Sequence, residues 1–172
     1  SVVDILAATK TAGYDMTGVA RRIANGGKTP TDRADASYDI VIVGGGAAGL
    51  AVAASLKSRK SSLDIAVIDP ADIHYYQPGW TMVGGGIFEA SDTAKTMGSL
   101  IPRGVTWIKS AVAAFEPKDD AVILDGCRVV KYKRLIVAPG LKLAWDRVEG
   151  LEATLGKNGV TSNYRYDLAP YT

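Results

Sequence analysis

The 172-residue sequence is poor in cysteine and histidine and has no long apolar run, and each scarcity excludes a class of protein. One cysteine, Cys127, excludes an internal disulfide and fits a reducing compartment. One histidine, His74, and no His/Cys/Asp cluster with ligand spacing argue against a metal site. No apolar run approaches the roughly 18 residues of a spanning helix, and the first residues lack a signal-peptide pattern. We therefore expect a soluble, cytoplasmic chain.

The charge balance points away from a nucleic-acid-binding protein. The formal net charge is +2, and the Lys and Arg residues are scattered along the chain instead of forming a basic stripe. A hydrophobic content of 47% with 22% charged residues is ordinary for a globular domain. The length allows one sizeable domain and a small appendage.

What the sequence does contain is a dinucleotide-binding pattern, around which the chain is organised. A continuous apolar run, Ile40–Val43, predicts a strand buried on both faces of a parallel sheet. A helical pattern follows from Ala47 to about Lys57. The turn between them has the spacing GxGxxG, with glycines at Gly44, Gly46 and Gly49.

Each part of this pattern has a physical task. Gly44 permits a tight turn, Gly46 lets backbone approach a pyrophosphate, and Gly49 lets the helix pack closely on the strand. The helix N-terminus presents unpaired N–H groups to phosphate. A second buried strand, Ile65–Ile68, ends in Asp69, 20 residues beyond Gly49, where a carboxylate accepts hydrogen bonds from a ribose. We interpret this as a dinucleotide fingerprint, against the alternative of a Gly-rich turn in an ordinary α/β unit.

The chain before this pattern divides in two. Residues 1–25 predict two short helices, and residues 26–37 carry no large apolar side chain, which indicates a linker. Because 25 residues are too few to bury a core, the first segment either packs on the main domain or forms the tail of a larger upstream domain. Residues 38–172 are then the main domain.

The segment after Asp69 is less regular. Residues 70–90 hold four aromatic side chains and three successive glycines, which fit either a loop along a flat cofactor or a rigid surface loop. Ser91 is a candidate cap for a helix over residues 92–100. A third parallel strand is expected at Val105–Ile108.

The last part predicts an antiparallel β-excursion followed by one more buried strand. Turn signals separate three strands, at about 112–116, 121–124 and 128–132. Leu135–Ala138 is a buried strand that Pro139 and Gly140 close. The fold class is therefore α/β, a Rossmann-like domain with a parallel sheet and an antiparallel excursion.

An excursion between two buried strands favours a flavin-binding fold over a simple dehydrogenase. Six segments carry a resemblance to a known family, namely Tyr38–Gly49, Asp69–Pro70, His74–Gly84, Ile101–Ile108, Leu135–Gly140 and Ser162–Tyr164. On these segments the chain resembles the flavoprotein disulfide-reductase superfamily, and within it the sulfide:quinone oxidoreductases, from residue 38 to about 167.

The resemblance implies FAD as the cofactor, bound without a covalent link. The residues implied to line its pyrophosphate are Gly44, Gly46, Ala47, Ala48 and Gly49. Those implied elsewhere are Asp69 at the adenosine ribose, Gln77 beside the cofactor, Val112 at the adenine, and Ala138, Pro139 and Gly140 at the second glycine turn.

The resemblance also implies sulfide and a membrane quinone as substrates. Such enzymes use a pair of redox cysteines, and in the branch resembled here both would lie beyond Thr172. Cys127 is interpreted as a structural thiol, so no catalytic residue is assigned. We expect a portion truncated at its C-terminal end, inactive alone, in the cytoplasm or at the inner face of a membrane. Membrane contact would come from the missing part.

Other interpretations stay open. The chain is also similar to type II NADH dehydrogenases and ferredoxin reductases, which share the glycine turns but lack the His74–Thr81 string. A nucleotide-binding fragment without redox turnover is a third possibility. Residues 1–25 resemble the closing helices of a dual-specificity-phosphatase-like domain.

Overall fold

The computed structural model describes Thr31 and residues 34–172 of the chain. These residues belong to two compact units, each of which is described by itself. One unit contains the described residues up to Ala71 together with Ile101–Gly140, and the other contains Asp72–Leu100 with Leu141–Thr172. The predicted helical tail, residues 1–25, lies outside the described residues.

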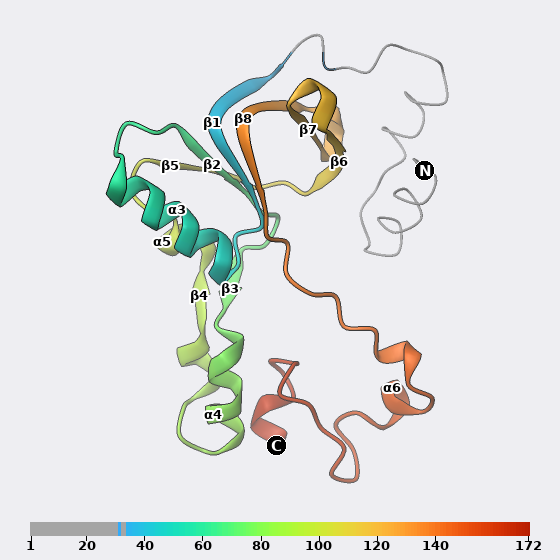
Figure 1. Cartoon of the computed structure of the whole chain (residues 1–172). Helices are drawn as coiled ribbons and strands as arrows, with labels where there is room; N and C mark the ends of the chain where they lie inside the picture. The colour runs from blue at the N-terminus through green and yellow to red at the C-terminus, as the bar shows by residue number, and fades with distance from the viewer. Residues whose placement is uncertain (1–30, 32–33) are drawn as a thin grey trace. The chain divides into compact units, whose positions relative to one another are not determined.

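The first unit is built on one six-stranded sheet with the order β5-β2-β1-β8-β7-β6 (Figure 1). The four strands β5, β2, β1 and β8 are parallel, and β7 runs antiparallel to both β8 and β6. The strands are β1 (Ala36–Val43), β2 (Ile65–Ile68), β5 (Val105–Ile108), β6 (Val112–Glu116), β7 (Ala121–Leu124) and β8 (Val129–Val137).

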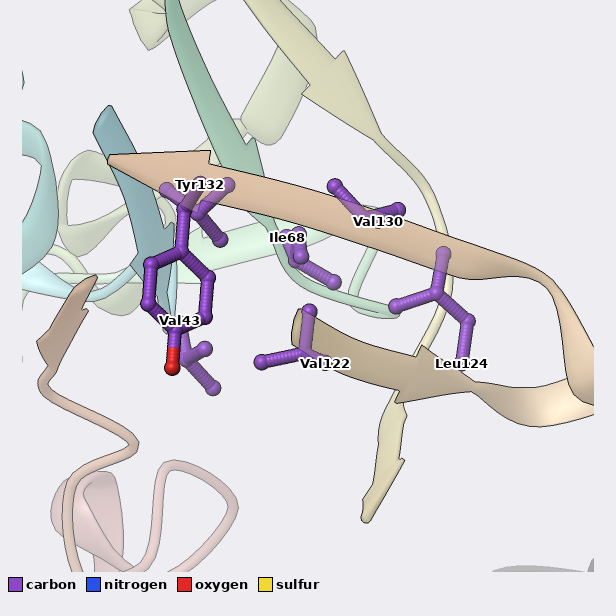
Figure 2. Packing of buried hydrophobic residues seen from close by; sticks show 7 residues of the cluster. Val43, Ile68, Val122, Leu124, Val130 and Tyr132 are labelled. Atoms are coloured by element: carbon purple, nitrogen blue, oxygen red, sulfur yellow. The ribbon is translucent and has the colours of Figure 1, made fainter. Parts of the chain in front are cut away.

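The two faces of the parallel strands bury separate cores because side chains alternate along a strand. On one face, Ile40 and Ile42 of β1 pack with Ala53 of helix α3 (Ala47–Arg59). On the other face, Val41 and Val43 join a cluster that includes side chains of β7, Ile68 of β2 and side chains of β8. Figure 2 shows this second core, with Val122 and Leu124 of β7 turned toward Val130 of β8 and Ile68 of β2.

The dinucleotide pattern folds as the sequence predicts. The strand, the turn and the helix follow one another as β1 and α3, and β2 and β5 have the predicted bounds. α3 extends two residues beyond the predicted end, to Arg59. β1 begins four residues earlier than predicted, at Ala36. Ala36 and Ser37, which the sequence places in the predicted linker 26–37, belong to β1 and pair with β8.

Two strands predicted separately, 128–132 and 135–138, are one strand, β8. Its first residues pair with β7, and the strand from Val130 onward pairs with β1, from Ala36↔Val130 to Val43↔Val137. The charged residues Lys133 and Arg134 suggest an interruption between two strands. They are part of one strand because β1 continues beside them, and nothing in the local sequence indicates that pairing.

The second unit contains a two-stranded antiparallel sheet and short helices. Its elements are β3 (Ile73–Tyr75), α4 (Trp80–Gly84), β4 (Ala94–Thr96), α5 (Met97–Leu100) and α6 (Leu151–Thr154). Trp80 and Val83 form a small core with Ala169. The rings of Tyr75 and Tyr166 are in contact, tilted by 45° with centroids 4.7 Å apart, so aromatic packing accounts for part of the aromatic-rich segment 70–90.

The helix predicted over residues 92–100 is wrong. Residues 94–96 are strand β4, which pairs with β3, and only Met97–Leu100 are α-helical. The backbone N–H of Met97 donates to the carbonyl of Asp72 at 2.7 Å. Pairing between segments far apart in the sequence therefore overrides a local capping signal at Ser91.

Candidate functional site

The glycine turn between β1 and α3 is a place where only glycine fits. Gly44 has a φ of +102°, and a β-carbon there would lie 2.1 Å from the carbonyl oxygen of Ala138. A β-carbon at Gly49 would lie 1.9 Å from the carbonyl oxygen of Gly44. The turn is therefore compressed between the end of β8 and the first turn of α3, and both glycines serve close packing.

Gly46 is different, because the space beside it is open. An added β-carbon at Gly46 would meet no atom within 4 Å, and Gly46, Ala47 and Ala48 are all exposed. Gly46 is the N-cap of α3, a helix of 13 residues with no acidic residue in its first turn. The first backbone N–H groups of α3 thus face accessible space at the positive end of the helix dipole, which is a favourable place for an anion.

The Asp69 carboxylate lies at the carboxyl end of β2 and contacts the glycine turn. Its Oδ2 accepts a hydrogen bond from the backbone N–H of Gly45 at 2.6 Å. Its Oδ1 accepts one from Ala71 at 2.8 Å. These two bonds fix the orientation of the carboxylate and leave each oxygen with capacity to accept another donor.

A cavity of about 200 Å³ opens at this end of the parallel strands. It brings together four of the residues predicted from the sequence, namely Gly44, Asp69, Val112 and Pro139. Its remaining lining comes from Val43, Ile68, Pro70, Ser110, Ala111, Phe115 and Val137. Most of these side chains are apolar, and two of them, Phe115 and Val137, are 39% and 53% exposed. An apolar cavity with one carboxylate at its rim is suited to a flat, hydroxyl-bearing ligand such as a nucleoside.

Sequence reasoning missed Ser110, Ala111 and Phe115. A general rule could have indicated the first two, since ligands of open α/β sheets bind beyond the carboxyl ends of the strands and these residues follow β5. Phe115 gives no local signal, because its position at the cavity depends on how the hairpin of β6 and β7 packs against β1 and β2.

Of the other predicted residues, two lie near the end of β8 in the first unit and one lies in the second unit. The backbone N–H of Ala138 donates to the carbonyl of Val43 at 2.8 Å, so Ala138 borders the glycine turn. Gly140 has a φ of +79° and open space beside it. Gln77 belongs to the second unit, where its Nε2 donates to the carbonyl of Asn163 at 3.2 Å. Gln77 is not one of the residues that line the cavity.

The remaining candidate chemistry is sparse. Cys127 is a half-buried free thiol packed beside Ala113 and Ile123. Within the described part of the chain, no three His, Cys, Asp or Glu side chains gather in a way that would hold a metal ion. None of the helices in Thr31 and residues 34–172 has the length and apolar content needed to cross a bilayer.

Residues 38–169 match the family model described as pyridine nucleotide-disulphide oxidoreductase. The match begins at residue 38, and the comparisons do not support the phosphatase-like interpretation of residues 1–25.

Among curated relatives, the chain is similar to two proteins named "Sulfide:quinone oxidoreductase, mitochondrial". It is 51% identical to that of Dictyostelium discoideum over 129 residues and 35% identical to that of Mus musculus over 127 residues. Each match covers 74% of this chain and 28% of the relative, so the chain spans less than a third of the length of these relatives.

Among solved structures, the chain is similar to the sulfide:quinone oxidoreductase of Aquifex aeolicus. The TM-score is 0.64 at 23% identity, covering 77% of this chain and 30% of that chain. At this identity the likeness establishes the fold alone.

Proposed function

The chain belongs to the pyridine nucleotide-disulphide oxidoreductase family, and we propose that within it the chain supplies the adenosine and pyrophosphate part of an FAD site. One observation carries this proposal. The Gly44 turn, the exposed first turn of α3 and the Asp69 carboxylate surround the same end of the parallel sheet, where the cavity opens. These residues fit the pyrophosphate and ribose of a dinucleotide.

Each residue has a separate task in the proposed site. The backbone N–H groups of Ala47 and Ala48 would bind the pyrophosphate, and the open space at Gly46 would admit it. Asp69 would accept hydrogen bonds from the ribose, and the apolar wall that includes Val112 would exclude water from the adenine. When bound, FAD would supply the capacity to accept and release two electrons.

We further propose that the substrates are sulfide and a quinone. The support is the identity of 51% and 35% to two proteins whose names state this activity, together with the His74–Thr81 string. Both relatives are named as mitochondrial, so we propose a mitochondrial location in place of the cytoplasm expected from composition. Cys127 is the sole cysteine of these 172 residues, so sulfide chemistry through a cysteine pair would need thiols from outside them.

An absorbance spectrum tests this proposal. The protein would be purified at its natural length, and its spectrum recorded before and after anaerobic sulfide and then after a soluble quinone. Flavin bands that bleach with sulfide and return with quinone are expected. Bands that ignore sulfide and bleach with NADH would favour a type II NADH dehydrogenase. A protein that binds neither FAD nor ADP would overturn the cofactor assignment.

A further inference from the structure

The hydrogen-bond ladder between β2 and β5 ends at Asp69. The backbone N–H of Asp69 donates to the carbonyl of Ile108 at 3.2 Å. The next residue, Pro70, has no N–H to donate. On the other strand the chain turns away, because the N–H of Ser110 donates back to Ile108 at 2.9 Å. The carbonyl oxygen of Asp69 therefore lies just past the last regular bond of the ladder.

A side chain supplies the bond that the backbone does not. The indole Nε1–H of Trp107 donates to the carbonyl oxygen of Asp69 at 2.9 Å, in a partly buried position. Trp107 pairs with Val67 in the β2–β5 register, so its ring reaches along the strand toward the carboxyl end of β2. The indole carries one N–H donor and no acceptor, so this single bond satisfies both the ring and the Asp69 carbonyl.

The residue that Trp107 holds is the one whose carboxylate lies at the rim of the cavity. The main chain of Asp69 is fixed by Trp107 and Ile108, and its carboxylate is fixed by Gly45 at 2.6 Å. We propose that Trp107 is a positioning residue for nucleotide binding, which acts through Asp69 by fixing the peptide that carries the carboxylate. This inference rests on the proposed function, because it concerns the ribose contact of the same site.

If Trp107 positions Asp69, its loss should weaken the binding of only those ligands that use the ribose hydroxyl. Loss of the indole N–H frees the Asp69 carbonyl, and the carboxylate then loses part of its fixed orientation toward a ribose hydroxyl. Binding energy that depends on the ribose hydroxyl should fall, whereas binding through pyrophosphate and adenine should not. A ring that serves only stability would weaken all ligands alike.

The test compares two ligands and removes one hydrogen-bond donor. ADP and 2′-deoxy-ADP are titrated into the flavin-free protein at its natural length, and FAD affinity is measured in parallel. Trp107→Phe removes the donor together with part of the ring. Replacement of Trp107 by benzothienylalanine removes the N–H and keeps the ring shape, so it separates the donor from the packing. Trp145→Phe is the matched control, since it makes the same chemical change in the second unit.

We expect both Trp107 variants to bind ADP about fivefold more weakly, because the hydrogen bond between the ribose and the Asp69 carboxylate is weakened, while 2′-deoxy-ADP affinity stays unchanged. In an Asp69→Asn background the same replacements should have little further effect, because the two residues act in series. Equal losses for both ligands, no loss, or full additivity with Asp69→Asn would each overturn the role of Trp107. A wild-type protein that binds neither FAD nor ADP would instead overturn the proposed function, and this role with it.

Discussion

The backbone of Gly44 and the carbonyl oxygen of Ala138 approach so closely that a β-carbon on Gly44 would lie 2.1 Å from that oxygen. This contact joins the end of β1 to the end of β8, two strands that are neighbours in the sheet and far apart in the sequence. The glycine turn therefore holds the ends of β1 and β8 together in the first unit, whether or not a ligand is bound.

Gly44→Ala should destabilise the protein. The substitution adds a clash with backbone to an unfavourable positive φ, so we expect a loss of more than about 2 kcal/mol in the free energy of unfolding. Urea denaturation measures it. Gly126→Ala is the control, because Gly126 also has a positive φ of 79° and its added β-carbon would meet nothing within 4 Å. Equal losses in the two variants would contradict the importance of the Ala138 contact.

Gly46→Val should leave the fold intact and weaken FAD binding. Gly46 has an ordinary φ of −71° and open space beside it, so valine can be accommodated in the flavin-free protein. The same side chain would occupy the space through which a pyrophosphate approaches α3. Flavin content after purification and the unfolding temperature are measured together. Full flavin content in this variant would place the pyrophosphate elsewhere.

Asp69→Asn should weaken FAD and ADP binding about tenfold, because a neutral amide replaces a charged acceptor at the ribose. The amide oxygen can still accept the N–H of Gly45, but the amide nitrogen is a donor and would face the N–H of Ala71, so we also expect a loss of about 1 kcal/mol in the free energy of unfolding. Isothermal titration with ADP gives the affinity, and denaturation monitors the fold. An unchanged ADP affinity would contradict the ribose assignment of Asp69.

Lys133→Met should raise the pKa of Asp39. The hydrogen bond from Lys133 is the largest cause that lowers the pKa of Asp39 below its ordinary value of 3.8, followed by the backbone N–H of Asp64. Lys133 Nζ lies 2.7 Å from Asp39 Oδ1. Because the folded-state pKa is lowered, the stabilisation is present above the ordinary pKa and is lost as pH falls through the lowered pKa.

An NMR titration of the Asp39 carboxyl carbon checks this expectation. Lys131→Met is a control from the same strand, because Lys131 donates to the carbonyl of Asp119 and not to a carboxylate. A pKa of Asp39 that is the same in the wild type and in Lys133→Met would contradict the assignment.

The sequence by itself determined the parts of the site that follow one another along the chain. The apolar runs at Ile40–Val43 and Ile65–Ile68 and the glycine spacing specify strand, turn, helix and strand, because each signal is local to a few residues. Asp69 could be placed at the end of its strand for the same reason. The hairpin strands β6 and β7 also have the predicted bounds, since turn residues separate them.

Only the tertiary structure decided which distant segments meet. β8 is one strand because β1 continues beside it, and residues 94–96 are a strand because β3 pairs with them. The bond of Gly45 to Asp69 and that of Trp107 to the Asp69 carbonyl join residues 24 and 38 positions apart. The physical reason is common to all four cases. A hydrogen bond between segments stabilises them only after the sheet has brought them together, and no periodicity within either segment records its partner.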